Sequence, residues 1–335
     1  MTITSIGDLA MTFSNRLSNV RIRTEMNTLA SELTTGRKSN LHTPLSGDLA
    51  PVAVIARSLS QFSAYETVIA ESALFLTGVQ NALSQVTDGL QSLAKAAIDI
   101  ENSISPVLIG NFGKNAHSRF SSLVNTLNGS IAGRSLFAGA DTTAQAVDNA
   151  ESILDDLAAN LPPGARYDDI SSAVDTYFAA GGGFDAQRYL GAATPMAPFR
   201  VSPEDSLALD VTAQNSALRE ALSATAKAAL LDRGVLSGDI AEQRKLIRKS
   251  GVNLFEAEAS VVALRGDIGM VEARIDTAKV RNGAETASLE MARSALIGAD
   301  PFQTATQLQA VQTQLETFYT LTARLSQLNL TGYLR

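Results

Sequence analysis

The chain has 335 residues, of which 45% are hydrophobic and only 5% aromatic, and it contains no Cys. Its formal net charge of −7 at pH 7 argues against nucleic acid, which binds clusters of Lys and Arg, and the missing Cys excludes disulfides and Cys-based zinc sites. No segment approaches the roughly 18 consecutive apolar residues of a transmembrane helix, and the first residues lack the cationic start of a secretory signal peptide. We therefore expect no nucleic acid partner, no membrane insertion and no cleaved signal.

Residues 1–44 are predicted to form one amphipathic helix that takes part in assembly. Their apolar residues recur at steps of three and four, as on one face of an α-helix. Gly36 is placed to end this helix, because Gly is favoured just beyond a helix C-terminus, and Pro44 prevents its continuation. The predicted stripe consists of Ile6, Leu9, Phe13, Leu17 and Val20.

Residues 45–140 are predicted to form the first half of a helical rod domain. An interior Pro costs a helix about 3 kcal/mol, and the stretches 52–105 and 107–161 contain none. The stretch 110–115, with two glycines, is predicted to be a turn between helices. One apolar series follows the heptad spacing of helices that pack nearly parallel, namely Leu76, Val79, Leu83, Val86, Leu90, Leu93, Ala97 and Ile100.

Residues 141–204 differ in character and are predicted to be a small, acidic insertion that faces solvent. Nine acidic and three basic residues fall within 141–200, so that this segment carries −6 of the total charge of −7. Glycines and prolines divide it into short pieces. The expected elements are helices at roughly 144–160 and 167–180, and extended pieces near 187–190, 197–201 and 207–212.

Residues 205–299 are predicted to form the second half of the rod domain, and 300–335 a second terminal helix. Asp300-Pro301 has the residue types favoured at the N-cap and first position of a helix. The heptad seam of this rod half is Val261, Leu264, Ile268, Val271, Ile275 and Ala278. The stripe of the terminal helix is Leu308, Val311, Leu315, Phe318, Leu325 and Leu328.

The two terminal stripes have no other local partner, so we expect them to pair with each other or with another chain. The predicted fold class follows from this arrangement. It is mainly α, with elongated antiparallel helical rods or a coiled coil formed by the N- and C-terminal halves around a small α+β insertion.

No group of residues in the sequence has the spacing of a catalytic or metal site. His42 and His117 are the only histidines, and without Cys they are too few for a transition-metal site, so we expect solvated or capping roles for both. Neither a nucleophile elbow nor a calcium-binding loop is present. We expect no enzymatic activity and no cofactor.

Two short motifs and the terminal helix carry a family resemblance. Thr35-Gly36-Arg37-Lys38 is followed by Asp48 and Pro51, and a second motif runs from Asn128 to Gly139. These segments resemble the flagellin family, and within it most of all the hook-associated proteins of the hook–filament junction. In that family the Asp directly precedes the Pro, whereas here Leu49-Ala50 separates them. The matching positions are Gly36, Arg37, Asp48, Pro51, Gly133, Arg134, Leu136, Phe137 and Gly139.

The resemblance implies a structural subunit of the bacterial flagellum that serves as the junction adapter needed for filament assembly and motility. It implies an extracellular location, reached unfolded through the flagellar type III export apparatus. The implied partners are further copies of this chain, a neighbouring hook-associated protein and flagellin; whether an export chaperone is also used stays open.

Two alternative functions remain open from the residues. The first is a filament flagellin, which the terminal Leu334-Arg335 resembles, although the Gly133–Gly139 motif and Ser326–Leu334 favour the junction adapter. The second is a coiled-coil signalling or export-accessory protein unrelated to flagella, which explains the heptads but not the two terminal stripes around an acidic insertion.

Overall fold

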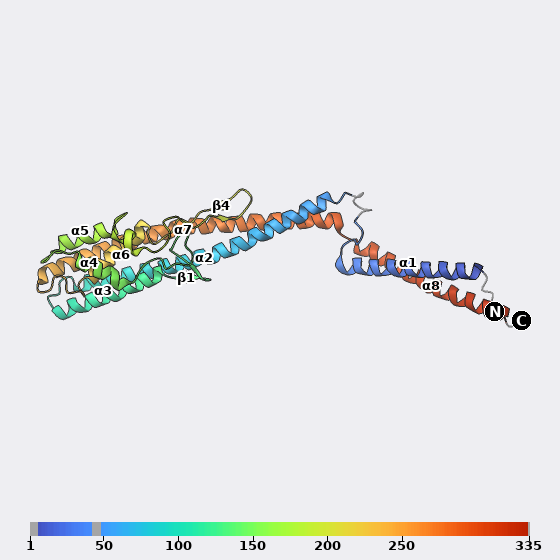
Figure 1. Ribbon diagram of the computed structural model, residues 1–335, viewed down its shortest axis with the longest axis horizontal. Helices are drawn as coiled ribbons and strands as arrows, with labels where there is room; N and C mark the ends of the chain where they lie inside the picture. Colours follow the sequence, from blue (N-terminus) through green and yellow to red (C-terminus); the bar gives the residue numbers. More distant parts are fainter. Residues whose placement is uncertain (1–5, 42–47, 334–335) are drawn as a thin grey trace. The chain divides into compact units, whose positions relative to one another are not determined.

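The computed structural model of the chain describes the backbone of residues 6–41 and 48–333, and the side chains of residues 9–41 and 48–324. The described residues are mainly helical, with two small antiparallel strand pairs (Figure 1). The predicted class, mainly α with a small α+β insertion, is confirmed.

The contacts between residues divide the chain into two compact units. One unit comprises residues 1–63 and 283–335, and the other residues 64–282. The predicted boundaries near 44 and 300 fall inside the first of these units, and those near 140 and 204 inside the second. The five-part division made from the sequence stays a prediction.

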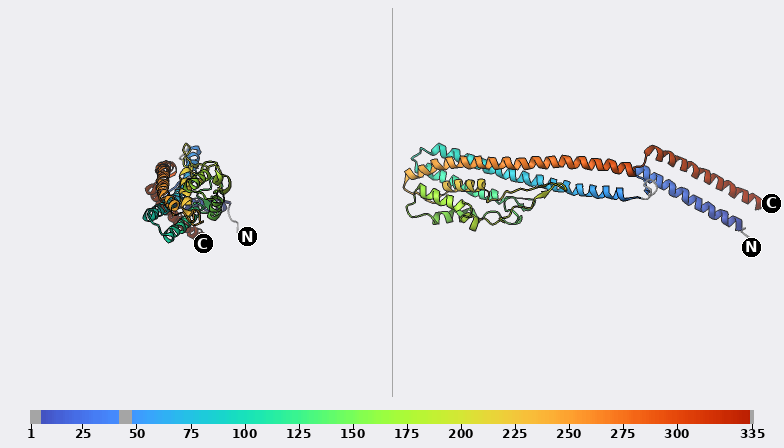
Figure 2. Two further views of the ribbon diagram at one scale, coloured as in Figure 1. Left: turned by 90° about the vertical axis from the view of Figure 1, so that its left-hand side faces the viewer. Right: turned by 90° about the horizontal axis from the view of Figure 1, so that it is seen from above.

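Two long antiparallel helices organise the unit of residues 64–282. α2 spans Ala50–Ile100 and α7 spans Ile240–Ile297, and they run side by side in Figures 1 and 2. Gln80 of α2 donates a hydrogen bond from Nε2 to the Arg265 carbonyl oxygen of α7 at 3.0 Å. The predicted heptad seams are confirmed, because their buried members are Leu76, Val79, Leu83, Val86, Leu90, Leu93, Ala97, Val261, Leu264, Ile268, Ile275 and Ala278, with Ile100 and Val271 packed beside them.

α3 (Pro106–Leu127) and α6 (Ser216–Ala229) pack against each other and extend this core. α6 is so enclosed that even its polar residues Thr225 and Lys227 are 2% and 4% exposed. A buried cation needs a partner, and Lys227 has one in Asp175 at 2.7 Å.

The stretch 110–115 lies inside α3, so the predicted interhelical turn is wrong. Gly113 is buried where α3 approaches the chain that follows α6, and a Cβ on Gly113 would come within 3.0 Å of the backbone nitrogen of Asp232. The glycine therefore permits close packing of two backbones rather than a turn. The connection between helices occurs earlier, between Ile100 and Pro106, and Pro106 begins α3 as its first residue.

The chain between α3 and α6 forms the predicted α+β insertion. Two helices, α4 and α5, occupy the places expected for helices, and a π-helix, η1, follows them. Leu207, Leu209 and Val211 are buried in alternation, as expected of an extended segment. The elements are α4 (Ala150–Ala159), α5 (Tyr167–Phe178), η1 (Phe184–Arg188), β1 (Ser130–Ile131) paired with β2 (Arg134–Ser135), and β3 (Phe199–Arg200) paired with β4 (Ser206–Leu207).

Several acidic side chains of the insertion are neutralised by nearby cations. Arg188 of η1 donates to Asp148 at 2.6 Å and to Asp156 at 2.7 Å. Lys227 reaches Asp175 from α6, outside the acidic segment. The excess negative charge read from the sequence is therefore balanced in part by cations of the same unit.

In the unit of residues 1–63 and 283–335, α1 (Ile6–Thr35) and α8 (Pro301–Tyr333) lie antiparallel, side by side (Figures 1 and 2). Gly36 follows α1 with φ of +65°, a left-handed conformation that Gly adopts readily, so the predicted helix end is confirmed. The predicted N-cap is confirmed as well, since Oδ1 of Asp300 accepts the N–H of Phe302 at 2.9 Å.

Candidate assembly surface

α1 and α8 are held together by one narrow apolar seam. Its buried residues are Ile22, Leu29 and Val311, which are 3%, 8% and 6% exposed. Because so few side chains are fully buried, the pair is expected to be much less stable than the core of residues 64–282. Met26, Leu308, Leu315 and Phe318 pack against this cluster and are half-buried.

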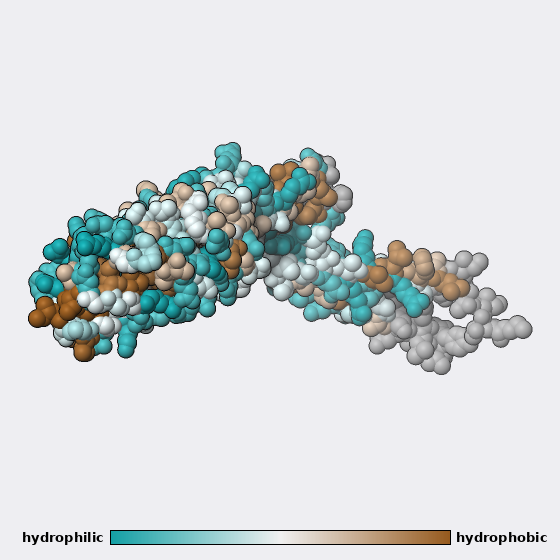
Figure 3. All heavy atoms as spheres, turned by 60° about the vertical axis from the view of Figure 1, so that its left-hand side comes forward, coloured by the Kyte–Doolittle hydropathy of each residue, from teal (hydrophilic) through white to brown (hydrophobic). Residues whose placement is uncertain are grey.

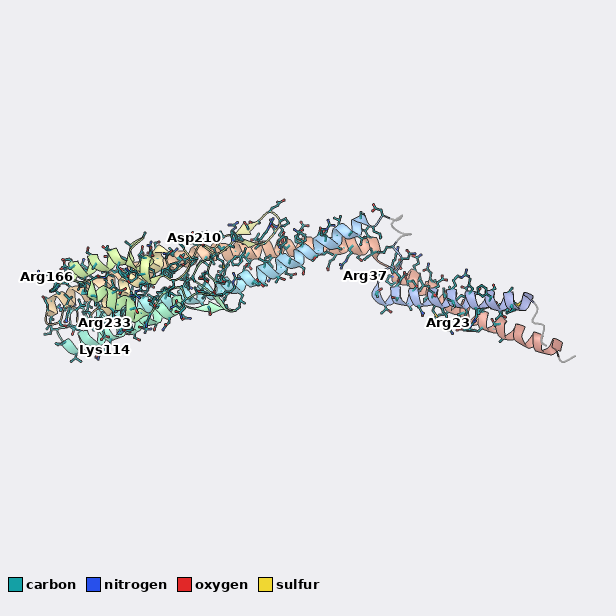
Figure 4. The ribbon with its side chains drawn as sticks, viewed as in Figure 1. Arg23, Arg37, Lys114, Arg166, Asp210 and Arg233 are labelled. Carbon is teal, nitrogen blue, oxygen red and sulfur yellow. The ribbon has the colours of Figure 1, made fainter. Side chains whose placement is uncertain are left out.

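A polar contact continues the seam. Arg23 of α1, labelled in Figure 4, donates to the Tyr319 hydroxyl of α8, from Nη2 at 2.8 Å and from Nε at 3.2 Å. Hydrogen bonds from Asn19 and Arg23 stabilise the phenolate and lower the pKa of Tyr319. Toward the start of α1 the half-buried positions are Asn15, Ser18 and Asn19, so the seam becomes polar there.

The predicted N-terminal stripe lies on the other face of α1. Phe13 and the buried Ile22 are nine positions apart, about two and a half helical turns, so the two side chains point in opposite directions. Apolar residues gather at this surface in Figure 3. A row of large exposed apolar residues of this kind marks an interaction surface more often than a free one. Its members Leu9, Phe13, Leu17 and Val20 are 61%, 67%, 63% and 64% exposed.

The structure thus places the two predicted stripes on different kinds of surface, one inside the helix pair and one outside it. Leu308, Val311, Leu315 and Phe318 of α8 face α1, whereas the α1 stripe faces away from α8. The side chains of Ile6, Leu325 and Leu328 lie outside the described residues. Sequence reasoning missed Ile22, Met26 and Leu29, whose own spacing of four and three was the signal available. The assembly role of both stripes stays a prediction.

The first family motif lies where α1 ends and α8 begins. The Lys38 N–H donates to the Ile297 carbonyl at 2.8 Å, and the Ala299 N–H donates to the Gly36 carbonyl at 3.0 Å. Arg37, labelled in Figure 4, pairs with Gly298 in the same short antiparallel bridge. The two connections into the α1–α8 pair are therefore tied to each other by backbone hydrogen bonds.

The remaining residues of this motif begin α2. Oδ1 of Asp48 accepts the Ala50 N–H at 2.9 Å, which caps the helix, and Pro51 occupies its first turn. The two residues between Asp48 and Pro51 thus fit an ordinary helix start.

The second family motif forms a structural joint in the unit of residues 64–282. Gly133, with φ of +77°, makes the turn between β1 and β2, and Arg134 lies over the Phe75 ring at 5.6 Å. Leu136 and Phe137 are buried, and the Phe137 carbonyl accepts the Ala213 N–H at 2.9 Å. The motif therefore connects the end of α3 to the chain that enters α6.

Gly139 ends the motif with a backbone that only Gly fits. Its φ is +64°, and a Cβ there would lie 2.6 Å from the carbonyl oxygens of both Ala192 and Thr194. The Ala140 N–H donates to the Thr194 carbonyl at 3.0 Å. The glycine thus allows the insertion to close against the end of the motif.

No group of three or more His, Asp or Glu side chains suited to a metal ion occurs among the described residues. None of the described helices has an apolar stretch that could cross a membrane. His42 lies outside the described residues. His117 contacts two carboxylates and has 23% of its side chain exposed, so it has specific partners that the sequence did not predict.

Comparisons with known proteins agree with this geometry. Residues 253–334, which include most of α7 and all of α8, match the bacterial flagellin C-terminal helical region. No curated protein sequence is significantly similar to the chain.

Two solved structures have a similar fold. One is a protein described as a flagellar hook-associated protein from Vibrio parahaemolyticus, at 14% identity and a TM-score of 0.52, covering 72% of this chain and 94% of that one. The other is FlgL from Bacillus cereus, at 13% identity and a TM-score of 0.52, covering 72% of this chain and 100% of that one.

The fold and the terminal helix pair define a mainly helical protein in which the helices from the two ends of the chain pack against each other. Residues 253–334 match the flagellin C-terminal helical region, and the chain shares the fold of the two solved structures.

Proposed function

We propose that this chain is the structural adapter of the hook–filament junction of the bacterial flagellum, needed for filament assembly and motility. The observation that carries the proposal is the two-sided α1 helix. One face pairs with α8 inside the chain, and the opposite face offers Leu9, Phe13, Leu17 and Val20 to another chain. The FlgL-like fold supports the junction over other positions in the flagellum.

Assembly on this surface would be driven by burial of apolar side chains. Fully burying an exposed Leu, Val or Phe side chain contributes about 1.5–3 kcal/mol. The four residues of α1 are about two-thirds exposed, so covering them supplies roughly 4–8 kcal/mol. Ordering the terminal helices and bringing subunits together costs a comparable amount. Association is therefore favourable only where neighbouring subunits already form a template. A contact between unlike faces repeats from one subunit to the next and builds a tube instead of a closed dimer.

A filament flagellin is the second candidate, and one observation favours it. The family model that matches residues 253–334 describes the C-terminal helical region of flagellins themselves. In that case the same terminal helices would make the same contacts along the whole filament.

The proposal includes the route and the partners of the chain. The subunit is exported without a cleaved signal through the flagellar export apparatus, with an export chaperone as an optional partner, and it acts outside the cell. Its neighbours are further copies, another hook-associated protein and flagellin. It carries no catalytic activity and binds no cofactor.

Deletion of the gene tests this function directly. Cells without the adapter should assemble hooks but carry no filaments, release flagellin into the medium and fail to swim, and the intact gene should restore all three properties. Cells that still carry normal filaments after the deletion would contradict the proposal, whereas loss of the filament protein itself would support the flagellin candidate.

A further inference from the structure

His117 of α3 lies between two carboxylates that come from other elements. Its Nδ1 is 2.7 Å from Oδ2 of Asp232, and its Nε2 is 2.6 Å from Oε1 of Glu151. Glu151 stands in the first turn of α4, and Asp232 lies in the turn that follows α6. One imidazole ring therefore joins three elements that are distant in the sequence.

Both short contacts require a ring that is protonated on both nitrogens. A neutral imidazole carries a single N–H, so its other nitrogen would present a lone pair to a carboxylate oxygen. In the imidazolium form both nitrogens donate, and such charged hydrogen bonds are roughly twice as strong as neutral ones. The geometry is that of a cationic His117 held by two anions.

The other charged groups at this cluster come from the same three elements. Arg233, next to Asp232, pairs with Glu151 and with Oδ1 of Asp155 on α4 at 2.9 Å. Lys114 precedes His117 by three residues on α3 and lies toward the same end of the unit as Arg233 (Figure 4). With the ring protonated, His117 and Arg233 offset two of the three carboxylates, and loss of the ring proton leaves two negative charges uncompensated.

We propose that His117 is a pH-sensitive latch that fastens α4 of the acidic insertion to α3 and to the turn after α6. The ring is partly buried, with 23% of the side chain exposed, so water screens its contacts only in part. Deprotonation turns one of its two hydrogen bonds into a repulsive contact and weakens the attachment of α4.

The direction of the pH dependence follows from the pKa of each partner. Burial disfavours the charged ring, but the hydrogen bonds to Asp232 and Glu151 outweigh this and raise the pKa of His117. A raised pKa gives stabilisation that is complete below about 6.5, the usual value, and is lost as the pH rises through the raised value. On the acid side, the hydrogen bond with His117 lowers the pKa of Glu151, so the latch holds until the pH falls through that lowered value.

Release of the latch would uncover the inner face of α4. Ile153 and Leu154 are 0% exposed and Leu157 is 2% exposed, all packed into the core of the unit. Alkaline pH would therefore raise the population of molecules that show this apolar face to solvent.

Two variants of the full chain test the latch. His42→Gln leaves His117 as the sole histidine, so its ring resonances can be assigned by NMR. In this variant the ring should titrate above the usual value of about 6.5. Hydrogen exchange at the α4 amides, expressed relative to the α5 amides to remove the chemical pH effect, should accelerate about tenfold as the ring loses its proton.

The double variant His42→Gln with His117→Gln is the matched control, because Gln keeps a donor and an acceptor but does not titrate. Its ratio of α4 to α5 exchange should not change across the same pH range. A ring that titrates at or below the usual value overturns the proposal, and so does an α4 response that is identical with and without His117. If the double variant fails to fold, the ring titration and α4 exchange of His42→Gln alone decide.

Discussion

Phe13 and Ile22 lie on opposite faces of α1, with Phe13 67% exposed and Ile22 3% exposed. Ile22 belongs to the cluster that joins α1 to α8, and Phe13 belongs to the row that no described residue of the chain covers. The same helix therefore serves two contacts, one that holds its own subunit together and one that is available to a neighbour.

Substitution of these two residues should separate the two contacts. Phe13→Asp should leave the α1–α8 pair intact and reduce association of subunits at least tenfold, because a charge would have to be buried between chains. Ile22→Asp should disrupt the pair itself, since its side chain is enclosed within the chain. Pelleting of assembled material together with hydrogen exchange of α1 distinguishes them. Normal assembly of Phe13→Asp would show that this face is not the interface.

Gly133 and Gly139 both have a positive φ, but only Gly139 lacks space for a Cβ. Gly133→Ala should cost about 1–2 kcal/mol, because only the left-handed backbone is penalised and nothing lies within 4 Å of the new Cβ. Gly139→Ala should cost about 3 kcal/mol or more, since its Cβ also meets two carbonyl oxygens at 2.6 Å. Urea unfolding followed by circular dichroism measures both. Equal losses would argue against a close approach at Gly139.

Gly110 and Gly113 of α3 should respond to Ala with opposite signs. Gly110 is exposed with open space around it, so Gly110→Ala should stabilise the helix by about 0.5–1 kcal/mol. Gly113→Ala should destabilise by about 1 kcal/mol, because its Cβ would press on the backbone at Asp232. Thermal unfolding of the two variants compares them, and a stabilising Gly113→Ala would contradict the tight contact between α3 and that turn.

The Arg188 cluster should make the unit of residues 64–282 sensitive to acid. The Asn149 N–H and Arg188 lower the pKa of Asp148, and Arg188 lowers that of Asp156 although burial opposes it. Lowered carboxyl pKa values contribute stability that is present above the unfolded value of about 3.9 and is lost as the pH falls through the folded values. Arg188→Gln should therefore be destabilised near neutrality and show a smaller further loss in acid.

Arg200→Gln is the control for that experiment, because the Arg200 guanidinium donates to the Pro203 carbonyl and not to a carboxylate. Urea midpoints at about pH 6 and about pH 2.5 provide the comparison. The same acid loss in wild type, Arg188→Gln and Arg200→Gln would show that the cluster does not govern acid stability.

The heptad seams of α2 and α7 could be predicted because local spacing decides them. Residues such as Leu83 and Val261 recur at steps of three and four, and each is 0% exposed. The helix end at Gly36 and the helix start at Asp300 could also be predicted, because capping depends on the residue types within one turn.

The remaining features depend on which distant segments meet. Glycines at 110 and 113 resemble a turn in the sequence, and only the nearby Asp232 backbone shows why a helix carries Gly113. His117 contacts Glu151, 34 positions away, and Asp232, 115 positions away, so no local sequence pattern predicts these contacts. The face of α1 that contacts α8 carries Ile22 and Leu29 in its second half but polar residues in its first half. The opposite face is apolar near the start of the helix, so apolar spacing alone selected the wrong face.

The most direct test of the proposed function is immunogold labelling of intact flagella with an antibody raised against residues 141–200. The account predicts gold particles at one position on each flagellum, where the hook meets the filament. Label along the entire filament would identify a filament subunit instead, and flagella without label would contradict a place for this chain in the assembled structure.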